Sequence, residues 1–377
     1  MDEPLMDMEA RVRCVVGAME GAGIDVLIAL QGDVHAFQST DAVALLSGLR
    51  FRGPSFVVLG ADGEATLTVS PPSELDRAAR LSPLSKARAA ADIHKALATC
   101  VEDLSAASAR VGVVGLDTLG YADALGIEKM LGGSVRRFDA EFGRVTVRKT
   151  AQEIANAERA TRIAEQGYAL MLDLAKPGIS ELDLATEMCC AMATAGADDN
   201  FLMLSADRHN RAVRPPGSRR LCAGDIILCE ISPAFNGQFS QICRTAMVGP
   251  GAEVYAAKYA LLQRSFQNGM RAARPGATVS DIVEAVNANL IAAGYREFCV
   301  PPHMRARGHG LGFGSIAPGD LKQESGVPIE REMVFVIHPN QYMPETGYMM
   351  CGDPVVITEA GARNLAAQPA SFDHIAL

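Results

Sequence analysis

An internal repeat in the second half of the chain limits the possible folds more than any other feature of the sequence. Residues 175–178 read Ala-Lys-Pro-Gly and residues 273–276 read Ala-Arg-Pro-Gly, and after each of them a helical pattern ends at a glycine after the same interval. A predicted pair of strands follows each copy, at residues 225–248 and 333–358. Such a unit buries its apolar face only against a second copy. The repeat therefore predicts one domain with pseudo-twofold symmetry, in which two hairpins form a curved antiparallel sheet covered by helices on its outside.

The residues before the repeat have the pattern of a smaller α/β domain. Buried strands are expected at residues 26–30, 55–60, 65–69 and 111–116, and an amphipathic helix at residues 93–104. A capping-box sequence, Thr-Ala-Gln-Glu at residues 150–153, then predicts the start of the first long helix of the repeat. Because 377 residues exceed the size of one ordinary core, we expect two domains, at residues 1–145 and 146–377. The predicted fold class is therefore α/β (α+β).

The composition excludes two classes of partner and indicates a compartment. The formal net charge is -9, which is the wrong sign for a protein that binds nucleic-acid phosphates. Gly, Asp or Glu interrupts the longest apolar stretches, so we expect no membrane span, and the acidic residues 1–4 lack the pattern of a signal peptide. Nine scattered cysteines without C-x-x-C spacing are typical of reduced thiols. We therefore expect a cytoplasmic protein whose partner is a small-molecule substrate.

Three motifs of the repeat domain carry a resemblance to a known family. They are Gly224–Leu228 leading into a hairpin that ends at Cys243–Thr245, the segment Gly308–Gly312, and Met333–Ile337 entering the last hairpin. Together they resemble the superfamily of creatinase, aminopeptidase P, prolidase and methionine aminopeptidase. The resemblance implies a small N-terminal α/β domain followed by a pita-bread domain, with the ligand on the concave face of the sheet.

The resemblance also implies a metal site whose ligands have changed. Most members hold two divalent ions with two Asp, one His and two Glu. The corresponding positions of this chain are Glu230, Gln241, His309, His338 and Gly352. Two ions need bridging carboxylates to offset about four positive charges, and only one carboxylate remains. We therefore expect no cofactor, with a single ion held by Glu230, His309 and His338 as the alternative.

Two further histidines used by the peptidase members are missing as well, because their places fall near Val213 and on Ala317. Creatinase is the metal-free precedent in this superfamily. The resemblance thus implies a creatinase-like, metal-independent hydrolase that cleaves a C–N bond of a small amide, amidine, guanidino or cyclic-imine compound. Three alternatives stay open. They are a lyase that abstracts a proton with His and Glu, a metal-dependent Xaa-Pro peptidase-like enzyme, and a catalytically dead pita-bread module that binds a ligand or a protein.

The expected catalytic residues are His309, His338 and Glu230. Either His309 or His338 would deprotonate water, and the sequence does not distinguish between them. Glu230 would orient a cationic nitrogen. The expected substrate-binding residues are Gln241, Arg305, Arg307, Tyr342 and His209. The two arginines would clamp a substrate carboxylate.

The resemblance implies a homodimer, because relatives with this first domain often complete the cleft from a neighbouring chain. Residues 37–49 contain the candidate loops for that contact.

Overall fold

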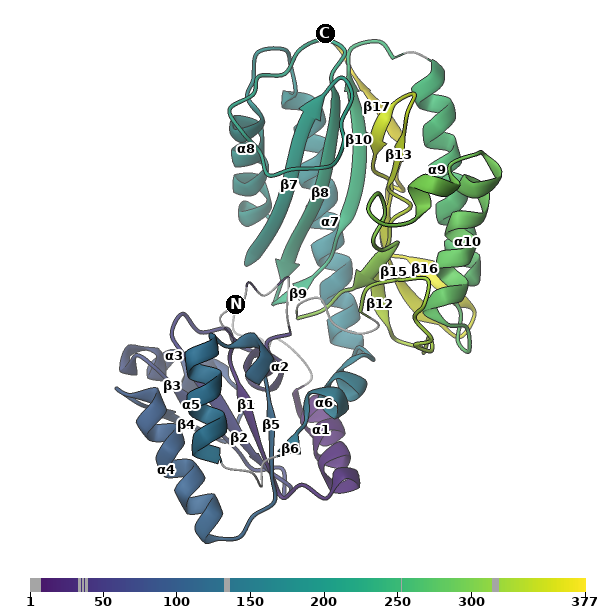
Figure 1. Cartoon of the computed structure of the whole chain (residues 1–377). Coiled ribbons are helices and arrows are strands. Elements are labelled where there is room, and N and C mark those ends of the chain that lie inside the picture. Colours follow the sequence, from purple (N-terminus) through teal and green to yellow (C-terminus); the bar gives the residue numbers. More distant parts are fainter. Residues whose placement is uncertain are drawn as a thin grey trace. The chain divides into compact units, whose positions relative to one another are not determined.

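The computed structural model describes residues 8–32, 35, 37, 40–131, 136–251, 253–313 and 319–377. The chain divides into two compact units, shown in Figure 1. The first unit holds the described residues up to Gln152 together with Phe313, and the second holds Glu153–Gly312 and the described residues from 319 to the C-terminus. No helix in the described part of the chain is both long enough and apolar enough to cross a membrane.

The first unit is built on a six-stranded mixed sheet in the order β4-β3-β2-β1-β5-β6. The strands are β1 (Val26–Leu30), β2 (Ser55–Gly60), β3 (Ala65–Val69), β4 (Lys86–Ala89), β5 (Val111–Val114) and β6 (Arg136–Arg137). The helices are α1 (Met8–Ala22), α2 (Ala42–Ser47), η1 (Pro72–Glu74), α3 (Leu75–Leu81), α4 (Ile93–Ala106), η2 (Leu116–Thr118), α5 (Tyr121–Leu131) and α6 (Asp139–Thr146). The strands β1, β2 and β3 have the bounds that the sequence predicts.

Strand β1 shows why the predicted strands of this unit are apolar throughout. Its side chains alternate between the two faces of the sheet, so that Leu27 and Ala29 enter one hydrophobic core while Ile28 and Leu30 enter another. The prediction of a strand at residues 111–116 was too long by its last two residues. Gly115 takes a φ of 98°, and a Cβ there would lie 2.5 Å from the carbonyl oxygen of Leu30, so the chain turns into η2.

The helices of the second unit follow the predicted repeat. They are α7 (Ala151–Leu174) and α8 (Glu181–Thr194) in the first copy, and α9 (Glu253–Ala272), α10 (Val279–Ala292) and η3 (Arg296–Cys299) in the second. Ser180 caps α8 by accepting a hydrogen bond from the Asp183 amide, and Thr278 caps α10 in the same way from Asp281. In both copies the glycine of the Pro-Gly sequence, Gly178 or Gly276, adopts the left-handed backbone conformation.

Two sheets of the second unit carry the two predicted hairpins. The first contains β7 (Asp199–Asp207), β8 (Ile226–Phe235), β9 (Gln238–Phe239), β10 (Ile242–Val248) and β17 (Phe372–Ile375). The second contains β11 (Gly308–Gly310), β12 (Val334–Ile337), β15 (Asp353–Thr358) and β16 (Gly361–Asn364), and a separate hairpin pairs β13 (Gln341–Met343) with β14 (Gly347–Met349). The sheets meet where Cys243 and Gly352 exchange two backbone hydrogen bonds of 2.9 and 3.2 Å. One pairing, β17 with β10, is parallel, which the repeat does not predict.

Alternation along β8 separates the two faces of the first sheet. Ile227, Cys229 and Ile231 pack into the core formed with α7 and α8. The intervening residues Ile226, Leu228 and Glu230 therefore point to the opposite face, which we call the inner face. Figure 1 shows α8 beside β7, and α9 and α10 beside the second sheet. The inner face is thus the surface of the sheet that the first pair of helices leaves uncovered.

Candidate active site

Glu230 is the acidic residue that β8 places on the inner face. Its neighbours across the ladder are Cys243 on β10 and Met203 on β7. Burial raises the pKa of Glu230 to about 7, and a hydrogen bond from the Gln241 side chain opposes that rise only in part. The Glu230 carboxyl group can therefore gain or lose a proton near neutral pH.

Neutral polar side chains surround Glu230. Gln241 donates to the Cys243 thiol at 3.5 Å, and Asn340 donates to the same sulfur at 3.8 Å. Asn340 is held in turn by the Cys351 amide, which donates to its Oδ1 at 2.9 Å. Burial raises the pKa of Tyr348, and the nearby Glu230 raises it further. The Glu230 cluster, comprising Glu230, Gln241, Cys243, Asn340 and Tyr348, is thus a polar site with a single carboxylate, in which Glu230 and Tyr348 are half-buried and the other three residues are buried.

The sequence reasoning did not assign a role to Cys243 or to Tyr348. A signal for Cys243 was present, because it lies on β10 two residues after Gln241, which directly precedes that strand, and two-residue spacing in extended chain keeps side chains on one face. Tyr348 is found only through its pairing with Tyr342 in the hairpin of β13 and β14.

The two candidate catalytic histidines lie together. His309 is on β11 and His338 directly follows β12, and their ring centroids are 5.9 Å apart in an edge-to-face arrangement. Burial lowers the pKa of His309, and it lowers the pKa of His338 to about 3. His338 is therefore a neutral imidazole at physiological pH. Its Nδ1 and the Oε1 of Gln241 are buried polar atoms without a hydrogen-bond partner in the described part of the chain.

The described residues do not fit the metal site of the superfamily. Within the described ranges, no three His, Cys, Asp or Glu side chains are grouped so that they could hold an ion. At position 352, a Cβ would lie 2.6 Å from the Cβ of His338 and 2.6 Å from the carbonyl oxygen of Ile337. A carboxylate side chain at this position would have no space beside His338.

The two arginines expected to bind substrate lie in different surroundings. The side chain of Arg307 is 1% exposed, and it donates to Asn287 Oδ1 at 2.7 Å, to the Asn340 carbonyl at 2.7 Å and to Gln341 Oε1 at 2.9 Å. Arg305 is exposed and lines a cavity beside α10. Neither guanidinium is hydrogen-bonded to a residue expected to be catalytic.

Tyr342 and His209 form a second group. Their rings meet edge to face at 5.7 Å, and Phe298 and His303 also contact Tyr342, at 5.4 and 6.2 Å between centroids. His209 is exposed and bonds the Pro344 carbonyl at 3.0 Å through Nε2. Val213, at the place of a peptidase histidine, packs against an apolar cluster that includes Ile226 and Leu228. Ala317, at the place of the other one, lies outside the described residues.

A buried ion pair lies on the other side of the sheet from Glu230. Arg244 on β10 and Asp353 on β15 pair at 2.7 Å, with side chains 2% and 0% exposed. Arg244 also donates to the carbonyls of Gly352 and Gln368. Asp353, which is adjacent in sequence to the changed ligand position, is thus committed to holding β10 and β15 together.

The two units, the repeat and the polar inner face together define a pita-bread protein. The sequence model of metallopeptidase family M24 matches residues 155–359, more than half of the chain, and the chain belongs to this family. The structure of an Xaa-Pro dipeptidase from Bacillus anthracis superposes with a TM-score of 0.83 at 18% identity, covering 98% of this chain and 100% of that one. The superfamily resemblance and the pita-bread fold are therefore confirmed.

Two relatives extend the comparison to activity. The Xaa-Pro dipeptidase of Pyrococcus furiosus is 26% identical over 366 residues, which is 95% of this chain and 98% of that protein. The uncharacterized peptidase YqhT of Bacillus subtilis is 29% identical over 224 residues, and this match spans 59% of this chain and 62% of YqhT. Both names describe peptidases.

These comparisons correct the predicted activity. The expectation of a creatinase-like, non-peptidase hydrolase of small C–N compounds is wrong, because the matched family and the named relatives are peptidases. The prediction gave too much weight to the changed ligand positions and too little to the strand and helix framework, which is shared along nearly the whole chain.

Proposed function

We propose that this chain hydrolyses short peptides, with Xaa-Pro dipeptides as its substrate class. The match to the Xaa-Pro dipeptidase of Pyrococcus furiosus carries the proposal, because it extends over 95% of this chain instead of stopping at the repeat domain. The likeness to the Bacillus anthracis structure supports the same two-unit architecture.

The side chains of the inner face support proton transfer in such a reaction. Peptide hydrolysis adds water to the carbonyl carbon, breaks the C–N bond and delivers a proton to the leaving nitrogen. Glu230, with its pKa raised to about 7, suits the uptake and release of that proton. His338 Nδ1 and Gln241 Oε1, which have no hydrogen-bond partner among the described residues, suit pairing with polar groups of a bound peptide.

The proposal is tested by measuring proline release from Leu-Pro and Ala-Pro, with Leu-Ala as the control dipeptide. Each assay is run with Mn²⁺, with Co²⁺ and with a chelator. We expect Glu230→Gln to lower kcat by about 100-fold or more, and Glu187→Gln, at an exposed residue of α8, to leave it unchanged. Failure to release proline under all three conditions would disprove hydrolysis, and equal cleavage of Leu-Ala would disprove the Xaa-Pro preference.

A second candidate is a module that binds such peptides without cleaving them. The absence of a three-ligand metal group from the described residues and the lack of space at Gly352 favour it. Calorimetric binding of Leu-Pro without release of proline under any of the three conditions would identify this case.

A further inference from the structure

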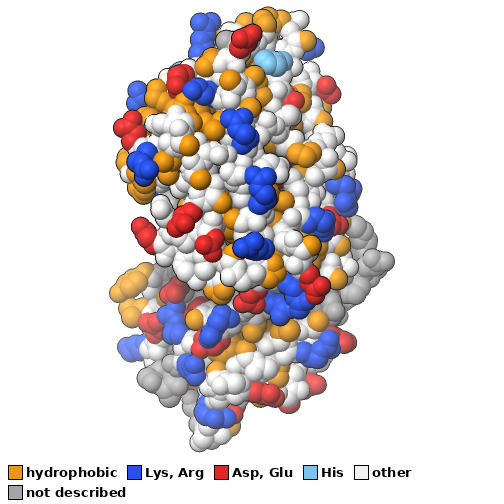
Figure 2. All heavy atoms as spheres, turned by 90° about the vertical axis from the view of Figure 1, so that its right-hand side faces the viewer, with side chains coloured by type: hydrophobic (Ala, Val, Ile, Leu, Met, Phe, Trp, Pro, Cys, Tyr) orange, Lys and Arg blue, Asp and Glu red, His pale blue; other side chains and the backbone are white. Residues whose placement is uncertain are grey.

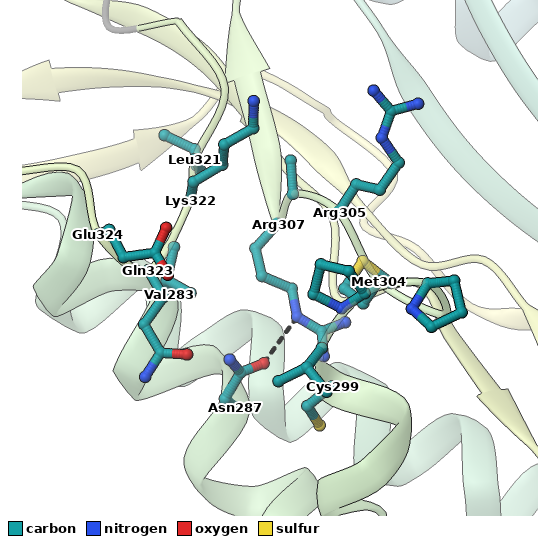
Figure 3. A pocket seen from close by; sticks show the side chains of 14 residues that line it. Val283, Asn287, Cys299, Met304, Arg305, Arg307, Leu321, Lys322, Gln323 and Glu324 are labelled. Atoms are coloured by element: carbon teal, nitrogen blue, oxygen red, sulfur yellow. Dashed lines mark hydrogen bonds between the residues drawn. The ribbon is translucent and has the colours of Figure 1, made fainter.

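A cavity of about 400 Å³ lies in the second unit, and none of the five residues of the Glu230 cluster lines it. It is bounded by α10, by the segments 299–302 and 304–307 that follow η3, and by residues 321–324 (Figure 3). Glu230, Gln241, His309 and His338 are not among its lining residues. The residues expected to be catalytic therefore do not line the cavity, and Arg307 connects its wall to Asn340 of the Glu230 cluster through a hydrogen bond of 2.7 Å.

Most of the cavity wall is apolar. The apolar lining residues include Val283, Val300, Pro301, Pro302, Met304 and Leu321. An apolar wall with a few polar groups is the usual composition of a small-molecule site in proteins. A ligand with a hydrocarbon body would fit this wall better than a fully polar one would.

Arg307 brings a buried positive charge to the base of this cavity. The groups that accept its hydrogen bonds from Nε, Nη1 and Nη2, namely the side-chain amides of Asn287 and Gln341 and the carbonyl of Asn340, are all neutral. Burial lowers the pKa of Arg307, which reflects the cost of keeping the guanidinium away from water. No carboxylate in the described part of the chain pairs with it. An anionic ligand in the cavity would offset this charge.

Two further cations stand at the edge of the cavity. Arg305 is exposed and has no hydrogen-bond or ion-pair partner among the described residues, and Lys322 pairs with Asp320 at 2.8 Å. In Figure 3 the Arg307 side chain extends down toward Asn287, whereas those of Arg305 and Lys322 extend up on either side of it. The acidic lining residue is Glu324. Three cations against one carboxylate give the lining an excess of positive charge.

This excess is local. Figure 2 shows that acidic and basic side chains are interspersed over the face of the molecule that it presents, and the chain as a whole carries a net charge of -9. A cavity with cationic lining in an acidic protein concentrates anions at one place.

We propose that this cavity binds a small organic anion, namely a carboxylate attached to an apolar body. The exposed guanidinium of Arg305 pairs with the carboxylate, Arg307 and Lys322 add attraction, and the hydrocarbon part packs against Val283, Met304 and Leu321. A ligand of this site therefore needs both a negative charge and an apolar surface.

Isothermal titration calorimetry with three probes tests the site. Hexanoate has both features, hexanamide has the same shape without the charge, and inorganic phosphate has charge without the hydrocarbon. We expect hexanoate to bind about tenfold more tightly than either of the others, because a charge-assisted hydrogen bond is stronger than a neutral one. The site is disproved if hexanoate does not bind, or if hexanamide or phosphate binds as tightly.

Two variants that change the charge of the cavity lining in opposite directions test whether hexanoate binds in this cavity. Arg305→Gln should weaken hexanoate binding about tenfold, and Glu324→Gln should strengthen it. Both side chains are exposed, so these variants should fold normally. Arg264→Gln, at an exposed residue of α9 outside the lining, makes the same charge change as Arg305→Gln and should have no effect. Hexanoate bound at the active site would respond equally to the two arginine variants, and that result would refute the assignment.

Discussion

At the scale of single residues, the carboxyl group of Glu230 makes stability depend on pH. Burial raises its folded-state pKa from 4.5 to about 7. Below pH 4.5 the group is protonated in both states and costs nothing, whereas above pH 7 the folded protein must hold a buried charge, at a cost of at most about 3 kcal/mol. Glu230→Gln should therefore stabilise the protein at pH 8 and have much less effect at pH 5.

Urea denaturation of Glu230→Gln and the parent, in chelator-treated buffer at both pH values, measures this difference. Glu187→Gln serves as the control, because its side chain is exposed on α8. A stability difference between Glu230→Gln and the parent that is the same at pH 5 and pH 8 would show that Glu230 has an ordinary pKa.

Gly352 is the second residue whose environment determines the site. A Cβ at this position would lie 2.6 Å from the His338 Cβ and 2.6 Å from the Ile337 carbonyl, both of which are fixed by β12. We expect Gly352→Ala to destabilise the protein by about 1–3 kcal/mol, the usual cost of overpacking. Gly326→Ala, where a Cβ meets no atom within 4 Å, should change stability by less than about 0.5 kcal/mol. Equal denaturation midpoints for the two variants would contradict the observed crowding.

At the scale of the elements, the Arg244–Asp353 pair holds the two sheets together where β10 meets β15. Asp353→Asn should cost about 3–5 kcal/mol, because it leaves a buried guanidinium without its carboxylate. Glu359→Gln, in an exposed pair with Arg331, should cost less than about 1 kcal/mol. Adding Arg244→Met to Asp353→Asn should cost less than the sum of the two single changes. Strict additivity in denaturant unfolding would show that the pair contributes nothing to the junction.

An element could be predicted from the sequence when the interactions that form it join residues close together in the chain. The apolar run of β1 and the caps of α8 and α10 depend on neighbours in sequence, so the strands, the helices and the repeat could be predicted. The parallel pairing of β17 with β10, and the burial of Arg307 under Asn340 and Gln341, depend on residues distant in sequence. A sequence pattern places Arg307 in a loop near His309, but it does not predict that the guanidinium binds Asn287 on α10 and the residues 340 and 341.

At the scale of the whole molecule, sedimentation distinguishes a single chain from a dimer. We propose a homodimer, on the resemblance to relatives that carry a first domain of this kind. Sedimentation at micromolar concentration should show a species of twice the 39.9 kDa chain mass. A single species at the chain mass would refute the dimer.

The two units should unfold in separate transitions of the intact chain. Each of the hydrophobic clusters described here draws its residues from one unit: Leu27 lies in a core of the first, and Leu184 in a core of the second. Leu27→Ala and Leu184→Ala each remove a fully buried side chain, at a cost of about 3 kcal/mol. Because a cavity destabilises the cooperative unit that contains it, calorimetry should show that each variant lowers the temperature of a different transition. A single transition shifted equally by both variants would mean that the chain unfolds as one cooperative body.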